Sequence, residues 1–163
     1  HGARAIGIAG GADKCRYVKE ELGFDACIDY KAGKLRDDLK AVAPGGIDCL
    51  FENVGGEIFD TLLMQMKPFS RIALCGLISQ YNSAPWPMQN ISAVLMNRIM
   101  MQGFIVSDDM SRWPLALKEL VGHVASGRIK YRESIANGLA AAPAALISLL
   151  QGGNFGKQLV KLV

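Results

Sequence analysis

Two glycines and a lysine stand close together near the start of the chain, in an arrangement that suits a phosphate. The apolar run at residues 5–9 (AIGIA) is followed by Gly10 and Gly11, and Lys14 comes three residues later. We expect a buried strand, a tight turn and the first turn of a helix, whose free N–H groups and partial positive charge favour an anion. Glycine also allows a ligand to approach the backbone closely. The stretch therefore predicts a site for the 2′-phosphate of NADP.

The same stretch also fits a plain strand–turn–helix junction, in which the glycines serve geometry alone and Lys14 is solvated. One feature favours the phosphate. Dinucleotide folds that prefer NAD place an acidic residue at the end of this strand to bind the ribose 2′-hydroxyl. Here Ala9 and Gly10 occupy that place, and Asp13 lies farther on, inside the predicted helix.

Three more polar groups directly follow predicted strands, and the carboxyl ends of parallel strands meet at one edge of a sheet. Tyr30 could line the same phosphate and adenosine pocket, or could be an ordinary strand-end tyrosine. Asn53 precedes the glycine pair 55–56 and could contact a ribose or the nicotinamide, or could close its own turn. Tyr81 could donate a hydrogen bond to a substrate oxygen, or could pack in a long loop.

Strand and helix patterns alternate along the chain and must position these groups. The expected strands are residues 4–9, 26–29, 47–52, 71–75, 102–106, 129–135 and 157–163. The expected helices are residues 12–22, 34–42, 57–66, 91–100, 112–125 and 140–150. This order predicts an α/β, Rossmann-like doubly wound fold, with a mostly parallel sheet and helices on both faces. The apolar run 47–52 suggests a strand covered on both faces.

The composition excludes several classes of protein. Half of the 163 residues are hydrophobic and 20% are charged, as in a globular domain, and a scattered net charge of +3 argues against nucleic-acid binding. Residues 135–150 are too short and too interrupted to span a membrane, and no signal peptide is evident. The four cysteines lack metal-site spacing, so we expect buried free thiols, no metal and a cytoplasmic location.

Taken together, the chain resembles the cofactor domain of the medium-chain dehydrogenase/reductase superfamily. Within it, the sequence is similar to the zinc-independent, NADP-dependent reductases of activated double bonds, the group of leukotriene B4 12-hydroxydehydrogenase/15-oxoprostaglandin 13-reductase, alkenal reductases and curcumin reductase. The segments that carry the resemblance run in order over almost the whole chain. They are residues 7–15 (GIAGGADKC), 28–31 (IDYK), 52–56 (ENVGG), 75–82 (CGLISQYN) and 154–157 (NFGK).

The resemblance implies roles for individual residues. Those toward the cofactor are Gly10, Gly11, Lys14, Tyr30, Asn53, Cys75, Ile78, Ser79, Phe104, Val106 and Asn154. Among them, Lys14 and Tyr30 would contact the 2′-phosphate, and Phe104 and Val106 would flank the nicotinamide amide. Tyr81 would lie near the substrate carbonyl. The implied chemistry is transfer of a hydride from NADPH to the β-carbon of an enone or enal, with the protein positioning and polarising the substrate. Quinone reduction, alcohol oxidation and a non-catalytic nucleotide-binding module are the alternatives.

The sequence departs from the family in one large respect. Family members carry an N-terminal catalytic domain, and their dinucleotide fold begins with a strand and a glycine-rich pyrophosphate loop, neither of which precedes residue 1. We therefore expect a piece of a longer chain, with a cofactor domain at residues 1–130 and a segment at residues 131–163 that returns to the catalytic domain. We also expect weak or absent NADPH binding by this piece alone, an exposed sheet edge, and a homodimer through the cofactor domain.

Overall fold

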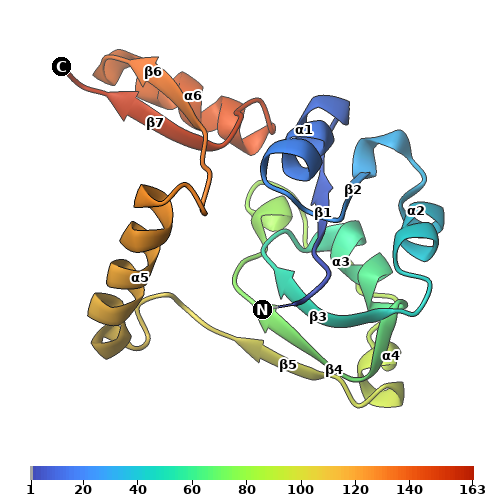
Figure 1. Cartoon of the computed structure of the whole chain (residues 1–163). Helices are drawn as coiled ribbons and strands as arrows, with labels where there is room; N and C mark the ends of the chain where they lie inside the picture. The colour runs from blue at the N-terminus through green and yellow to red at the C-terminus, as the bar shows by residue number, and fades with distance from the viewer. Residues whose placement is uncertain (1) are drawn as a thin grey trace.

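The computed structural model describes residues 2–163 and places all seven strands in parallel pairs (Figure 1). Strands β1 (Ile6–Ala9) and β2 (Ala26–Asp29) form one pair. Strands β3 (Ile47–Glu52), β4 (Met66–Leu74) and β5 (Met100–Gly103) form a second sheet with β4 in the middle. Strands β6 (Glu133–Asn137) and β7 (Lys157–Lys161) form the third. The predicted α/β class with parallel strands is confirmed.

Helices connect the parallel strands, as such connections require. The α-helices are α1 (Ala12–Arg16), α2 (Leu35–Val42), α3 (Gly56–Leu63), α4 (Ser92–Met96), α5 (Trp113–Ala125) and α6 (Ala142–Leu150). Helix α1 continues as a wider π-helical segment, η1 (Tyr17–Glu21), so the predicted helix 12–22 exists but changes its winding. Short 3-10 turns are η2 (Tyr30–Ala32), η3 (Ile78–Gln80), η4 (Met110–Arg112) and η5 (Leu139–Ala141).

Two boundaries around β4 and β5 differ from the sequence prediction. Strand β4 begins at Met66, inside the helix expected at 57–66, because Met66 pairs with Ile47 ahead of Pro68. Strand β5 occupies Met100–Gly103, in register with residues 71–74, and so the strand expected at 102–106 was placed too late. Helix α4 is shorter than predicted because the chain turns sharply after Met96, with Arg98 at a positive φ of 48°.

The buried core lies in two clusters, one around the β3–β4–β5 sheet and one around the β1–β2 pair. The first contains Phe59, Leu63, Met66, Ile72, Ala93 and Ile99. The second contains Ile28, Leu39 and Leu62. Helix α3 joins the clusters, since Leu62 belongs to one and Leu63 to the other, and it thereby fixes the two sheets relative to each other.

Strands β1 and β3 are not hydrogen-bonded to each other, and a cavity of about 480 Å³ lies between them. Ile6 and Ile8 line it from β1, and Leu50 and Phe51 line it from β3. Phe51 is 66% exposed, so the prediction that residues 47–52 are covered on both faces is wrong. Both strands therefore present an open edge, in agreement with the expectation of an exposed sheet edge.

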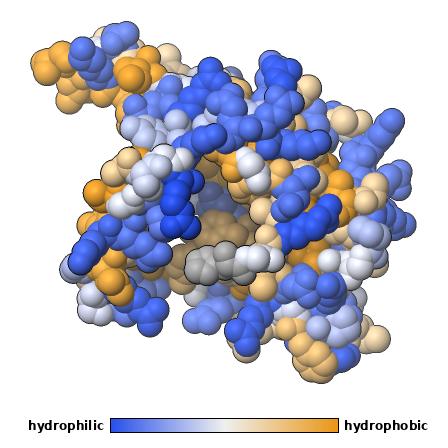
Figure 2. Space-filling view, in the orientation of Figure 1, coloured by the Kyte–Doolittle hydropathy of each residue, from blue (hydrophilic) through white to orange (hydrophobic). Residues whose placement is uncertain are grey.

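The C-terminal third of the chain packs less tightly. Helix α5 contains no buried residue, and Leu115 and Val121 are more than half exposed. Figure 1 shows α5 apart from the sheets, with the β6–α6–β7 unit beyond it. In Figure 2 the extension at the upper left presents apolar residues among polar ones. Leu162, near the C-terminus, is 62% exposed.

Candidate functional site

The carboxyl ends of β1 and β2 form a corner in which Gly10, Tyr30 and Lys31 meet. A Cβ built on Gly10 would lie 2.9 Å from the Tyr30 hydroxyl and 2.9 Å from Lys31 Cε, so a larger residue there would displace these two side-chain ends. At Gly11 the backbone has φ of 100°, a conformation that L side chains rarely adopt, and a Cβ would meet nothing within 4 Å. The corner thus combines a crowded floor at Gly10 with open space above Gly11, where a ligand can approach the backbone.

Asp29 ties the two loops of this corner together. Its Oδ1 accepts a 2.8 Å hydrogen bond from the Gly11 N–H and a 3.0 Å hydrogen bond from the Lys31 N–H. The Gly11 N–H is therefore already bonded and is not among the N–H groups that this turn leaves free. Strand β1 ends at Ala9 without an acidic residue, as the sequence indicates. The nearby Asp29 carboxylate is bonded to the backbone N–H groups of Gly11 and Lys31.

Lys14 lies at the same corner and links it to the C-terminal part of the chain. Its Nζ donates a 2.7 Å hydrogen bond to the carbonyl oxygen of Gly152, which is 138 residues away in sequence. Nearby, Tyr17 and Phe155 pack edge to face with ring centroids 5.1 Å apart, and the Arg132 guanidinium lies 4.4 Å from the Phe155 ring centroid. These contacts attach the β6–α6–β7 unit to helix α1.

A second pair of loops, after β3 and β4, is held together by glycines. Cβ atoms on Gly55 and Gly56 would meet Leu77 Cδ2 at 2.8 Å and Ser79 Oγ at 2.9 Å. Asn53 Oδ1 lies so close to Gly76 that no side chain would fit there. These glycines let the two loops touch.

Hydrogen bonds join the same two loops. The Ser79 N–H and hydroxyl both donate to the Val54 carbonyl, at 2.9 and 2.6 Å. The Ile78 N–H donates to the Asn53 carbonyl at 3.3 Å. The Asn53 turn and the Ser79 turn therefore form one connected edge next to the cavity between β1 and β3.

Two carboxylates that the sequence did not single out hold this edge. Glu52 is 3% exposed, and its Oε1 accepts hydrogen bonds from the N–H groups of Val54 (2.5 Å) and Gly55 (2.7 Å). Asp60 is 4% exposed and accepts from the backbone N–H groups of Gln89 and Asn90 and from Trp86 Nε1, so it anchors the loop that follows Tyr81. Glu52 is part of the segment 52–56 but received no role from the sequence, and Asp60 belongs to none of the segments named above. An acidic residue in a sequence gives no sign of which N–H groups it will face.

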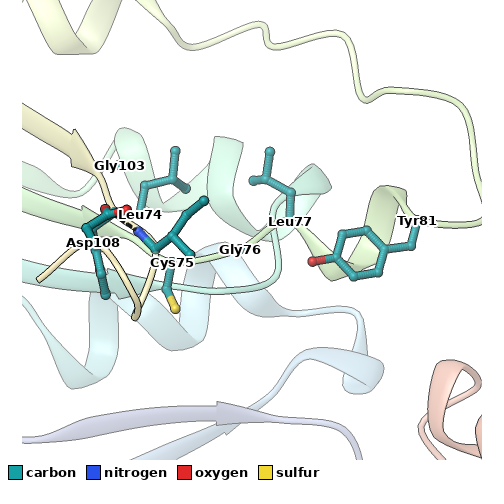
Figure 3. Close-up of a pocket in the computed structure, with 9 residues that line it drawn as sticks. Leu74, Cys75, Gly76, Leu77, Tyr81, Gly103 and Asp108 are labelled. Carbon is teal, nitrogen blue, oxygen red and sulfur yellow. Dashed lines mark hydrogen bonds between the residues drawn. The ribbon is translucent and has the colours of Figure 1, made fainter. Parts of the chain in front are cut away.

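Two cavities collect most of the predicted site residues. The 480 Å³ cavity between β1 and β3 is lined by Tyr30, Asn53, Ile78 and Ser79, and also by Gly152, the carbonyl partner of Lys14. An open cavity of about 530 Å³ is lined by Cys75, Tyr81 and Phe104, together with Asp108. In Figure 3 the Tyr81 ring reaches toward the segment that carries Gly76 and Leu77, with its hydroxyl leading.

Five predicted residues line neither cavity. Three of them, Gly10, Gly11 and Lys14, belong to the corner described above, and the other two are Val106 and Asn154. The Val106 side chain is 70% exposed, and its carbonyl accepts a hydrogen bond from Trp113 Nε1 at 3.0 Å. Asn154 Nδ2 donates to the Gly156 carbonyl at 2.6 Å, in the same loop as Gly152. The structure brings Asn154 near the Lys14 corner through this loop, whereas it does not bring Val106 to a lined cavity.

The cysteines differ in environment. Cys49 and Cys75 are exposed, so the expectation of four buried thiols is wrong, while Cys15 and Cys27 are half-buried. Burial raises the pKa of the Cys27 thiol to about 12, with a hydrogen bond to Cys15 acting in the same direction. Cys27 is therefore a neutral thiol beside Cys15 rather than a nucleophile. Among residues 2–163, no cluster of His, Cys, Asp and Glu has the geometry to hold a metal ion.

Comparison with known proteins gives a consistent set of relatives. The family model described as zinc-binding dehydrogenase matches residues 1–122. The chain is 40% identical to the NADPH-dependent curcumin reductase of Escherichia coli (strain K12), over 99% of this chain and 49% of that protein. It is 44% identical to prostaglandin reductase 1 of Oryctolagus cuniculus, over 96% of this chain and 46% of that protein. The chain thus spans about half the length of the curated relatives it matches.

Solved structures agree with the sequence relatives. The crystal structure of CurA in complex with NADPH from Vibrio vulnificus superposes with a TM-score of 0.91 and 45% identity, over 99% of this chain and 50% of that one. An NAD-dependent alcohol dehydrogenase superposes with a TM-score of 0.81 at 24% identity, a similarity that concerns the fold alone. None of the helices within residues 2–163 has the length and apolar character that crossing a bilayer requires.

Proposed function

The chain belongs to the zinc-binding dehydrogenase family of the medium-chain dehydrogenase/reductase superfamily, and on this basis we propose that it is the NADP(H)-binding half of a reductase of α,β-unsaturated aldehydes and ketones. The resemblance drawn from the sequence to the prostaglandin and curcumin reductase group is confirmed by these matches. The activity and the substrate class come from relatives that are about twice as long.

The observation that carries the proposal is the corner at the ends of β1 and β2. The Tyr30 hydroxyl lies against Gly10, beside the open space above Gly11, and Lys14 bonds Gly152, which lines the same cavity as Tyr30. A 2′-phosphate there would accept hydrogen bonds from an ammonium and a phenol, and charge-assisted bonds of this kind are the strong ones. An NAD ribose would need a free carboxylate at this place, and Asp29 already accepts two backbone N–H groups.

The rest of the site suits an extended dinucleotide. The connected edge formed by Asn53 and Ser79 borders the cavity between β1 and β3, so the middle of the cofactor would run along it. From there the cavity lined by Cys75, Tyr81 and Phe104 would take the nicotinamide end and the substrate. The surrounding loops are already hydrogen-bonded in place, which limits the ordering that binding requires.

When bound, NADPH supplies the hydride for the reaction. The residues of this chain would position the two reactants and polarise the substrate. The Tyr81 hydroxyl would donate a hydrogen bond to the substrate carbonyl oxygen, where negative charge grows as the β-carbon is reduced. Leu74, Leu77 and Phe104 would place apolar surface beside the reacting atoms on one side of this open cavity, and a lower local polarity strengthens that hydrogen bond.

We extend the proposal to the organisation of the whole protein. The open edges of β1 and β3 would receive a strand from the missing part of the dinucleotide fold, with a glycine-rich pyrophosphate loop beside it. Residues 131–163 would return to a catalytic domain, which would cover apolar residues such as Leu162. A homodimer through the cofactor domain and a cytoplasmic location, consistent with four free cysteines, complete the proposal.

The experiment is NADPH oxidation by the complete protein, followed with an enal, a cyclic enone, a quinone and an aliphatic aldehyde as separate substrates. We expect turnover of the enal and enone, and a Tyr81→Phe variant whose kcat is about 10- to 100-fold lower with little change in the KM for NADPH. Turnover restricted to the quinone or the aldehyde would assign the protein to another branch of the superfamily. An unchanged kcat in Tyr81→Phe would remove the tyrosine from the mechanism.

A further inference from the structure

The Lys31 side chain lies over the corner at the ends of β1 and β2, although the family resemblance, which includes the segment 28–31, implies no role for it. The position that a Gly10 Cβ would occupy is 2.9 Å from Lys31 Cε and 2.9 Å from the Tyr30 hydroxyl. The two side chains therefore border one point, directly above the end of β1.

The backbone holds Lys31 in this place. Lys31 lies within the single 3-10 turn η2, and its N–H donates to Asp29 Oδ1, the atom that also accepts the Gly11 N–H. Asp29 Oδ1 thus holds the backbone of Lys31 and the backbone of Gly11, the glycine above which the space is open.

The positive charge at this corner has no carboxylate partner. The salt bridges formed within residues 2–163 involve neither Lys31 nor Lys14. Lys14 Nζ bonds a carbonyl oxygen, and Asp29 directs Oδ1 to two backbone N–H groups. Lys31 lies beside a phenol and an open glycine turn, and Lys14 stands on the helix that begins at this turn. A dianion bound there would neutralise both lysines and could accept bonds from all three donors.

We propose that Lys31 is a second cation for the cofactor's 2′-phosphate and a determinant of the preference for NADPH over NADH. The inference rests on the proposed function, since it assigns a further residue to the same site. Lys14 would approach the phosphate from the α1 side and Lys31 from the β2 side, with the Tyr30 hydroxyl between them. A dianionic phosphate would be matched by two positive charges rather than one.

The test uses the complete protein and two ligands that differ only in the 2′-phosphate, adenosine 2′,5′-bisphosphate and adenosine 5′-monophosphate. Calorimetric titration compares the wild type with Lys31→Gln, Lys31→Arg and Lys14→Gln. Lys40→Gln, an exposed lysine on α2, is the matched control for loss of one charge. Titrations at several KCl concentrations measure how strongly the bisphosphate affinity depends on salt, which reports the number of positive charges in contact with the 2′-phosphate.

We expect Lys31→Gln to weaken binding of the bisphosphate about fivefold, as for an exposed charge contact, and to leave the monophosphate unchanged. Lys31→Arg should keep most of the affinity, and Lys40→Gln should change neither ligand. The dependence of bisphosphate affinity on KCl should also become shallower in Lys31→Gln.

Two results would overturn the inference in different ways. If the wild type prefers the bisphosphate, Lys14→Gln removes the preference and Lys31→Gln does not, then Lys31 is only a solvated lysine and the proposed function stands. Equal weakening of both ligands by Lys31→Gln would also reject the inference, because it would mean a general distortion of the corner. A wild type with no preference between the two ligands would reject NADP(H) specificity itself, and Lys31 with it.

Discussion

Replacement of Glu52 tests whether a buried carboxylate shapes the cofactor edge. Glu52 Oε1 accepts from the Val54 N–H at 2.5 Å and from the Gly55 N–H at 2.7 Å, and the side chain is 3% exposed. Each hydrogen bond to a charged group contributes about 1.5 to 3 kcal/mol net. Glu52→Ala removes both bonds and leaves the buried Gly55 N–H without its acceptor, while water can reach Val54, which is 38% exposed.

We therefore expect Glu52→Ala to lower the free energy of unfolding by about 3 kcal/mol. Glu52→Gln keeps an amide oxygen that can accept both N–H groups and should cost only about 1 kcal/mol, the charge-assisted part of the two bonds. Glu20→Ala, at an exposed glutamate, is the control and should change stability by less than about 0.5 kcal/mol.

The assay is urea unfolding of the complete protein, followed by circular dichroism, with a parallel measurement of NADPH affinity. NADPH binding should weaken in Glu52→Ala, because Asn53 and Ser79 depend on the same turn. If Glu52→Ala matched the Glu20→Ala control in stability, the two hydrogen bonds would not hold the turn. If Glu52→Gln lowered the free energy of unfolding as much as Glu52→Ala, the stabilisation would come from the negative charge and not from the position of an oxygen that accepts both N–H groups.

Three further outcomes follow from the geometry. Gly11→Ala forces a side chain into φ of 100° and should cost about 1 to 3 kcal/mol, whereas Gly45→Ala, with open space and no positive φ, should be nearly neutral in the same thermal melts. The raised pKa of Cys27 means that the unfolded chain loses this proton near pH 9 and the folded chain only near pH 12, so stability should fall as pH rises across that window. Cys27→Ala should flatten the fall, and an unchanged slope would contradict this. Arg132→Ala removes the guanidinium 4.4 Å from the Phe155 ring and should cost about 1 kcal/mol, seen as faster hydrogen exchange in residues 151–157 than in α3.

The local pattern of the chain was sufficient to predict most elements. Strands at 26–29 and 47–52 have the predicted bounds, because each is a short apolar run between clear turn residues. The wrong predictions concern strand boundaries that are set by pairing with residues far away in the sequence. Register with Ile47 starts β4 before Pro68, and register with residues 71–74 ends β5 at Gly103, so the apolar residues 104–106 lie beyond the strand.

Exposure was the least predictable property. The apolar composition of residues 47–52 and of α5 indicates burial, but Phe51 is 66% exposed and Leu115 is 73% exposed. The apolar composition of a segment indicates that it tends to be buried, but it does not identify the element that would cover it. The chain spans about half the length of its relatives. Segments whose apolar sequence predicts burial are exposed within residues 2–163, and there the sequence pattern and the accessibility disagree.

The site follows a principle that residue types alone do not show. Glycines were visible in the sequence at each turn, and they allow close approach, but a glycine turn is flexible by itself. In the structure each turn is closed by a carboxylate: Asp29 accepts from Gly11 across two strands, and Glu52 accepts from Gly55 within one. The acidic residues thus supply the rigidity that the glycines lack, so the loops keep their shape before a ligand arrives and binding requires less ordering. Their negative charge is directed to backbone N–H groups, which leaves Lys14 and Lys31 to set the charge of the corner.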